Sequence, residues 1–274
     1  MKTKTSVAGS FRDPSGFLFY QDELIYRQVN IVYKEHYDRL IKTGLYDALA
    51  KATLLIPHEE VEIEAPGPAS AYKIIKPELI DFISYPYEWC FSQFKDAAFC
   101  ILQIQKKALE FGMSLKDASA YNIQFLNNKP ILIDTLSLET YHEGRPWVAY
   151  RQFCQHFLAP LLLMAETDIR LSQLLRIHID GIPLDLAAIL LPFRSRFRFS
   201  TLTHIHLHAK SQRYFSDKTN NRQNVQNRKI TRQSFFGLID NLESAVRRLK
   251  WKAPDTEWED YYQNTNYSSE AMSQ

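Results

Sequence analysis

Three polar residues, Asp117, Asn122 and Asp134, stand in the otherwise apolar stretch LKDASAYNIQFLNNKPILIDTLSLE at residues 115–139. Carboxylate and amide oxygens are the ligands that Mg²⁺ prefers, and a carboxylate can also orient a hydroxyl group. If the three side chains meet, they can hold a divalent cation with bound phosphate beside an acceptor hydroxyl. The structural alternative is that the first Asp caps a turn, the Asn bonds the backbone and the second Asp ends a strand.

A predicted β-hairpin brings two of these residues together. The runs IQFL and PILID are typical of strands, and Asn127 and Asn128 between them tolerate the positive φ of a tight turn. A two-residue turn there places Asn122 opposite Ile133, and therefore beside Asp134. The first Asp of the stretch lies on the preceding loop and can face the same mouth.

The surrounding elements predict a mixed α+β chain with a small β-rich N-lobe and an α-rich C-lobe. Residues 16–29 are typical of two strands, and Val32 to Ala50 has helical spacing. EEVEIE and AYKIIKPELIDFISY favour strands, and a helix from Phe94 ends at Gly112. The domains that we expect are an N-lobe at 10–92, a C-lobe at 93–210, a polar linker at 211–232, and a helix and tail at 233–274.

The order of loop Asp, Asn, hairpin and second Asp resembles the catalytic core of the protein-kinase-like fold. The resemblance implies Mg²⁺ and ATP as cofactors, a catalytic role for Asp117, and metal ligands at Asn122 and Asp134. Leu115 and Lys116 replace the His-Arg of protein kinases, and Thr-Leu follows the second Asp in place of Phe-Gly. The protein-kinase subfamily is thus excluded, which leaves an atypical small-molecule kinase with an unidentified acceptor, or an inactive pseudokinase that serves as a binding module.

The basic residue that would bind phosphate is ambiguous. Arg27, at the end of the second predicted strand, is our first choice, with Glu35 as its partner on the following helix. Lys73 and Lys76 compete with it. The turn QDE between the first two strands contains no glycine-rich loop.

A broader resemblance extends over nearly the whole chain. Segments such as SFRDPSGFLF, ISYPYEWCFSQFKDAAF and WVAYRQFCQHFLAPL resemble the N-terminal half of a bacterial family of class I S-adenosylmethionine-dependent methyltransferases related to nodulation proteins. This implies a methyltransferase domain or subunit as partner. Because the chain stops at Gln274 without a glycine-rich adenosylmethionine loop, we expect S-adenosylmethionine to bind only such a missing domain.

Composition excludes several other classes. A net charge of +2 gives no general attraction to nucleic acid, so a nucleic-acid partner is not expected. The longest apolar run, FLAPLLLMA, is too short to span a bilayer, and the three scattered cysteines suit a reducing compartment, so we expect a cytoplasmic protein without a membrane partner. In HIHLH, a strand would place His204, His206 and His208 on one face for Zn²⁺ or Ni²⁺; the alternative is hydrogen-bonded structural histidines.

Overall fold

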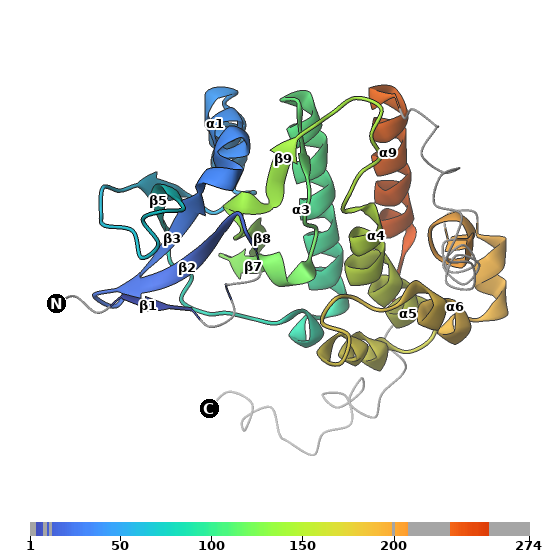
Figure 1. The fold of residues 1–274 in the computed structure, drawn as a ribbon. Coiled ribbons are helices and arrows are strands. Elements are labelled where there is room, and N and C mark those ends of the chain that lie inside the picture. The colour runs from blue at the N-terminus through green and yellow to red at the C-terminus, as the bar shows by residue number, and fades with distance from the viewer. Residues whose placement is uncertain (1–3, 8–9, 11–12, 199–200, 208–230, 252–274) are drawn as a thin grey trace, which may run out of the picture.

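A computed structural model describes residues 4–7, 10, 13–198, 201–207 and 231–251 of the chain. A β-sheet with two short helices forms one lobe, and a larger group of helices forms the other (Figure 1). The α+β class and the two-lobed arrangement predicted from the sequence are confirmed.

The sheet lobe contains a five-stranded antiparallel sheet in the order β1-β2-β3-β5-β4. Its strands are β1 (Lys4–Ser6), β2 (Gly16–Gln21), β3 (Leu24–Asn30), β4 (His58–Glu60) and β5 (Ala71–Pro77). A Cβ atom on Gly16 would lie only 2.1 Å from the carbonyl oxygen of Gln28, so this position requires glycine where β2 starts beside β3. The sequence prediction missed β1, because three polar residues carry no periodic signal.

Two helices follow β3, where the sequence predicted one from Val32 to Ala50. They are α1 (Lys34–Lys42) and α2 (Leu45–Lys51). The break falls at Gly44, whose φ of 80° is left-handed and interrupts the helical path. The prediction of a helical region was therefore confirmed, but the region contains two helices instead of one continuous helix.

Contacts on one face of the sheet hold α1 in place. Tyr33 and Tyr37 pack with Val29 of β3 and Ile75 of β5 in a small buried cluster. Leu136, from the segment after the hairpin, completes this cluster. The apolar face of α1 thus joins the sheet to the helical lobe.

A connection at residues 78–90 leads from the sheet to the helical lobe. Within it, the backbone N–H of Ser84 donates to Oε1 of Gln124 at 2.9 Å, and Nε2 of Gln124 donates to the Ser84 carbonyl at 3.0 Å. The long helix α3 (Phe91–Glu110) follows and forms the centre of the main hydrophobic core. The chain then turns at Gly112, whose φ is 70°.

Two small strand pairs follow α3. Strand β6 (Met113–Leu115) pairs with β9 (Leu138–Thr140), and β7 (Ile123–Leu126) pairs with β8 (Lys129–Leu132). Asn127 and Asn128 have φ values of 50° and 62°, as the two-residue turn requires. Leu126 pairs with Lys129, so the predicted register of the hairpin is confirmed.

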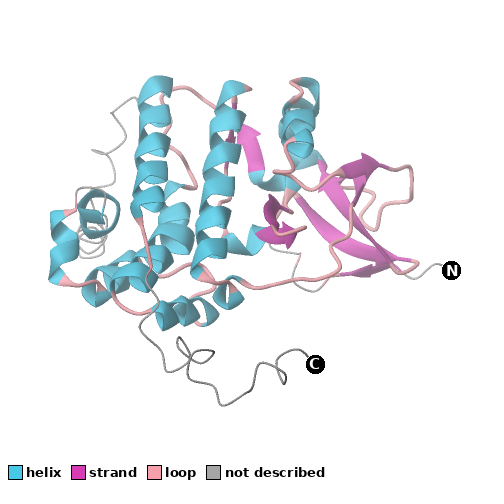
Figure 2. Ribbon diagram, turned by 180° about the vertical axis from the view of Figure 1, so that it is seen from behind, coloured by secondary structure: helices cyan, strands magenta, loops and turns pink. Residues whose placement is uncertain are grey.

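The rest of the described chain consists of helices joined by loops (Figure 2). The α-helices are α4 (Tyr150–Phe153), α5 (Ala159–Glu166), α6 (Leu184–Leu190) and α9 (Arg232–Arg248). Two π-helical turns lie at Cys154–Leu158 and Leu202–His206, and two 3-10 segments lie at Ile169–Arg176 and Phe193–Phe197. Helix α9 lies beside α3, where Nζ of Lys106 contacts Asp240 at 2.6 Å and Glu243 at 2.5 Å.

Residues 211–230 of the predicted linker and residues 252–274 of the predicted tail lie outside the described part of the chain. Among the helices that are described, none combines the length and the apolar character needed to cross a bilayer.

Candidate functional site

A cavity of about 310 Å³ lies between the sheet and the β7–β8 hairpin. One part of its lining is apolar and the other carries charged and amide groups. The apolar residues are Val7, Leu18, Ile75, Pro77 and Ile133; the polar ones are Ser10, Asp13, Arg27, Asn122, Asp134 and Thr135. The cavity thus combines a surface for a flat apolar group with groups suited to phosphate and a cation.

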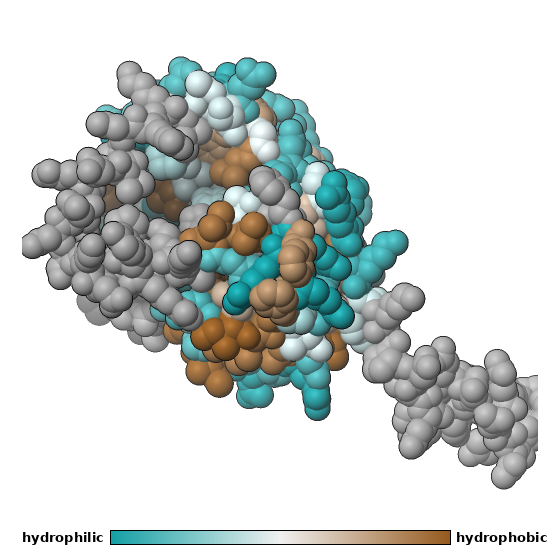
Figure 3. All heavy atoms as spheres, turned by 90° about the vertical axis from the view of Figure 1, so that its right-hand side faces the viewer, coloured by the Kyte–Doolittle hydropathy of each residue, from teal (hydrophilic) through white to brown (hydrophobic). Residues whose placement is uncertain are grey.

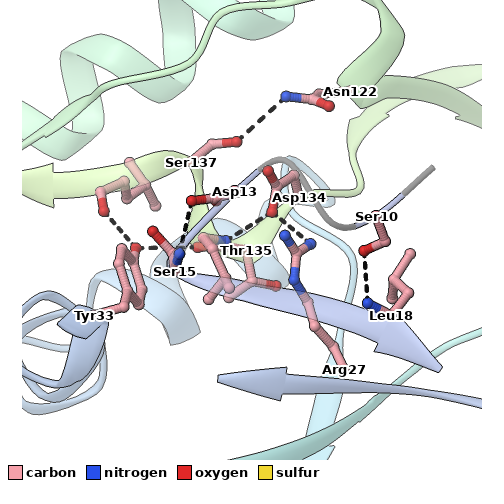
Figure 4. A network of polar contacts seen from close by, with 12 residues as sticks. Ser10, Asp13, Ser15, Leu18, Arg27, Tyr33, Asn122, Asp134, Thr135 and Ser137 are labelled. Atoms are coloured by element: carbon pink, nitrogen blue, oxygen red, sulfur yellow. Dashed lines mark hydrogen bonds and ion pairs between the residues drawn. The ribbon is translucent and has the colours of Figure 1, made fainter. Parts of the chain in front are cut away.

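Arg27 and Asp134 meet across this cavity (Figure 4). Nη1 of Arg27 lies 2.5 Å from Oδ1 of Asp134, and their side chains are only 12% and 15% exposed. The same carboxylate oxygen accepts the backbone N–H of Leu136 at 2.9 Å, and Nε of Arg27 is buried without a hydrogen-bond partner. The predicted pairing of Arg27 with Glu35 is wrong, because the ion pair is made with Asp134 and Glu35 is exposed on α1.

The hairpin places Asn122 at the same cavity. Its carbonyl oxygen accepts the N–H of Ile133 at 2.8 Å, and this hydrogen bond holds Asn122 close to Asp134, the residue that follows Ile133 in the chain. Its side-chain amide donates weakly, at 3.5 Å, to Oγ of Ser137 (Figure 4). Asn122 and Asp134 therefore present one amide and one carboxylate to the cavity, a donor set that suits Mg²⁺ when phosphate and water complete the coordination.

Among the described residues, no group of three or more His, Cys, Asp or Glu side chains forms a metal cluster. A cation at this cavity would therefore rely on few protein ligands. That is typical of Mg²⁺ bound together with a phosphorylated ligand.

Asp117 lies on the loop between β6 and β7 and is half-buried, outside the residues that line the cavity. Its Oδ1 accepts the N–H of Ser119 at 2.9 Å and Nε2 of Gln152 at 2.8 Å. Gln152 of α4 also accepts the N–H of Ala118 at 2.6 Å, so α4 helps to fix this loop. Both hydrogen bonds use one carboxylate oxygen, and among the described residues Oδ2 has no hydrogen-bond partner.

Lys116, directly before Asp117, reaches from the helical lobe to the loop between β1 and β2. Its Nζ donates to Oγ of Ser15 at 2.7 Å and lies 3.7 Å from the carboxylate of Asp13. It also lies 5.0 Å from the centre of the Tyr33 ring. In the sequence this lysine stood out only as a departure from His-Arg, and nothing near it indicated that it would lie beside Asp13 of the cavity lining.

Tyr33 is buried next to Lys116. Its hydroxyl donates to the backbone carbonyl of Leu138, the first residue of β9. Burial, together with the negative charge of nearby Asp134, raises the pKa of Tyr33 well above its ordinary value. The hydroxyl therefore remains protonated and serves as a hydrogen-bond donor that joins the lobes.

The competing lysines do not line the cavity. Lys73 pairs with Glu60 at 2.6 Å and Lys76 pairs with Glu59 at 3.2 Å, in each case between β5 and the edge strand β4. Ile75 is the direct neighbour of Arg27 across β3 and β5, so Lys76, one residue further, points to the opposite face. Of the three basic candidates, the structure brings only Arg27 to the described cavity lining.

The described part of HIHLH, residues 204–207, is helical, so the strand that would have placed the histidines on one face for a metal ion is not formed there. His204 lies 2.6 Å from the hydroxyl of Tyr150 and 2.8 Å from Oδ1 of Asn241, and His206 lies 2.9 Å from Oγ of Ser195. His208 lies outside the described residues. These contacts favour hydrogen-bonded structural histidines over metal ligands.

No family model matches the chain. The chain is similar to the nodulation protein NoeA of Rhizobium meliloti, with 32% identity over 270 residues that make up 96% of this chain and 56% of NoeA. It thus spans about half the length of this curated relative. Among solved structures it matches vaccinia related kinase 3 with a TM-score of 0.41 and 9% identity, over 90% of this chain and 87% of that chain.

Proposed function

We propose that the chain binds a nucleotide such as ATP together with Mg²⁺ in the cavity between the lobes. The observation that carries this proposal is that Arg27 of β3 and the two residues that flank the β7–β8 hairpin, Asn122 and Asp134, line one cavity. The cavity also offers an apolar wall from the sheet and the hairpin. A base, a phosphate chain and a hard cation require this combination of surfaces.

Each part of the lining then has a role. Leu18 and Ile75 pack against the base, and Arg27 binds phosphate oxygens through its planar guanidinium. Asn122 and Asp134 hold the Mg²⁺, whose chemistry is to neutralise charge on the phosphates. Because Arg27 is paired with Asp134, it must exchange part of that contact for phosphate when the ligand binds.

Asp117 supports a further step, the transfer of phosphate to a small molecule. One oxygen of its carboxylate is fixed by Ser119 and Gln152, which leaves the other to orient an acceptor hydroxyl. A different observation favours the second candidate, a pseudokinase that binds nucleotide without turnover. Asp117 lies outside the residues that line the cavity, and is thus separated from the proposed nucleotide site.

The similarity to NoeA supports a place for this chain within a longer protein. We propose that it acts as the kinase-like module of a methyltransferase-type protein related to nodulation. In that arrangement S-adenosylmethionine binds to the methyltransferase domain or subunit, and the present chain contributes the nucleotide site.

Thermal unfolding with Mg²⁺ and ATP tests the nucleotide site. At a hundredfold excess over the dissociation constant the ligand should stabilise the chain by about 2.7 kcal/mol. Asp134→Asn should remove most of this stabilisation because it deletes the anionic metal ligand. The matched control is Asp240→Asn, which removes an exposed carboxylate on α9 and should leave the shift unchanged.

Two results would contradict the proposal. One is a wild-type chain whose melting temperature does not respond to Mg²⁺ and ATP together. The other is an equal shift in Asp134→Asn and Asp240→Asn, which would put the ligand at another place.

A further inference from the structure

A second cavity, of about 470 Å³, lies within the helical lobe. It is formed where the end of α9 meets α5, the end of the turn at Cys154–Leu158, and the residues Arg198 and Thr201. It shares no lining residue with the cavity between the lobes. Its volume falls within the range of about 300–1,000 Å³ that is usual for small-molecule sites.

The floor of this cavity is apolar. Leu158 and Leu162 contribute one side, and Ala245 and Leu249 of the α9 end contribute the other. All four line the cavity and are at least 93% buried, so each adds only a small apolar surface to it. An apolar group bound here would be largely removed from water.

The polar part of the lining carries donors and no carboxylate. Arg198 and Arg248 provide two guanidinium groups, and Thr201 and Ser244 provide hydroxyls. Arg198 already contacts Glu166, which also lies 3.6 Å from Nε of Arg194, so this acid is shared between two arginines. For Arg248, no ion pair is found within the described part of the chain. Among the described residues, the lining therefore carries two guanidinium groups and no carboxylate.

Asn241 adds a fixed amide to the lining. Its Oδ1 lies 2.8 Å from Nε2 of His204, and Nδ1 of His204 lies 2.6 Å from the hydroxyl of Tyr150. Burial lowers the pKa of His204, so the ring stays neutral and can donate one hydrogen bond to Asn241. With its oxygen engaged in this way, Asn241 has its amide N–H groups to offer as donors at the cavity.

From these contacts we infer that the cavity is a binding site for a small amphipathic anion, with an apolar body and a carboxylate, sulfonate or phosphate head. The apolar body lies on the leucine and alanine floor, and the head binds Arg248 with help from Ser244 and Asn241. Arginine suits this role because its planar fork binds oxyanions through two hydrogen bonds. The inference does not depend on the nucleotide site.

The helical lobe also exposes apolar residues on its outer surface. Figure 3 faces the end of the molecule that carries α6, where brown residues gather among teal ones and beside residues that are not described. Ile189 of α6 is 67% exposed, and Phe193 is 68% exposed.

Fluorescence titration of the full chain with anilinonaphthalene sulfonate tests the site, because this probe joins an aromatic body to a sulfonate. We expect saturable binding of one probe per chain, and displacement by decanoate but not by decanol. Arg248→Gln should weaken both anions about tenfold through the loss of one charge-assisted contact. Arg247→Gln is the matched control, since Arg247 is the adjacent arginine, pairs with Glu243 at 2.6 Å and does not line the cavity.

Ala245→Phe supplies a second, independent variant because it fills the apolar floor without altering charge, and it should abolish binding of the probe. Circular dichroism and the melting temperature establish that each variant folds. The inference fails if Arg248→Gln and Arg247→Gln have the same affinity, if decanol displaces the probe as well as decanoate does, or if the wild-type chain shows no saturable binding.

Discussion

Arg27 and Asp134 form an ion pair that joins the sheet lobe to the helical lobe, with Nη1 and Oδ1 2.5 Å apart. Arg27 lies in β3, and Asp134 follows β8 of the hairpin, so the pair connects segments more than a hundred residues apart. Both side chains are largely buried, and each charge therefore depends on the other for stabilisation. The pair has a structural role whether or not a nucleotide binds beside it.

A double-mutant cycle measures this dependence. Arg27→Met and Asp134→Asn should each destabilise the chain, and the double variant should lose less than the sum, with a coupling free energy of about 1–3 kcal/mol in urea unfolding. The exposed pair of Lys76 and Glu59 is the comparison, and its coupling should be below about 1 kcal/mol. Equal coupling in the two pairs would mean that burial adds nothing.

A substitution of Asp117 distinguishes an active phosphotransferase from a module that only binds nucleotide. Asp117→Asn keeps an oxygen that can accept from Ser119 and Gln152 but removes the charge that would orient an acceptor hydroxyl. Phosphate transfer or slow ATP hydrolysis should fall by about 10² or more, while stabilisation by Mg²⁺ and ATP stays the same. A wild-type chain that binds nucleotide clearly and shows no turnover would favour the pseudokinase.

Lys116 should control the loop between β1 and β2. The N–H of Ser15 donates to Oδ1 of Asp13 at 2.8 Å, and Lys116 contacts both residues from the helical lobe. Removing Lys116 leaves the hydrogen bond between Ser15 and Asp13 without these contacts. Lys116→Met should therefore increase hydrogen exchange at the described residues 13–15 and lower the free energy of unfolding by about 1 kcal/mol. Lys73→Met removes an exposed ion pair elsewhere on the same lobe and should leave that exchange unchanged.

The hairpin could be predicted from the sequence because its determinants are local. Asn127 and Asn128 adopt left-handed φ values in a turn of two residues, and this alone fixes which residues face each other. The position of Asn122 beside the residue before Asp134 follows directly. The long helix α3 was also predictable, since ten of its residues are buried at helical spacing.

The partners of the site residues could not be predicted, because they come from distant segments. Nothing near Asp117 in sequence indicates that Gln152 will hold its carboxylate, 35 residues away. Glu35 was a reasonable partner for Arg27 by order along the chain, but the side chain that reaches Arg27 belongs to the other lobe. HIHLH alternates as a strand does, yet the packing of His204 against Tyr150 and Asn241 accompanies a helical backbone.

Burial of His58 should make stability depend on pH. This histidine lies in β4 with Nε2 3.2 Å from the hydroxyl of Tyr37, and its Nδ1 is buried without a partner. Burial lowers its pKa to about 4 in the folded chain, whereas an unfolded histidine titrates near 6.5. As the pH falls from about 6.5 to about 4, the unfolded chain takes up a proton that the folded chain does not bind, so stability decreases in this window.

His58→Gln should flatten this dependence, because glutamine does not titrate and Tyr37 keeps its hydrogen bond to Glu60. Urea unfolding at pH 7, 6, 5 and 4 should give the variant a slope that is smaller than the wild-type slope by up to about 1.4 kcal/mol per pH unit. His142→Gln is the control, since His142 is exposed after β9 and its replacement should leave the slope unchanged. Parallel curves for His58→Gln and the wild type would show that His58 is not held neutral by its place in the sheet.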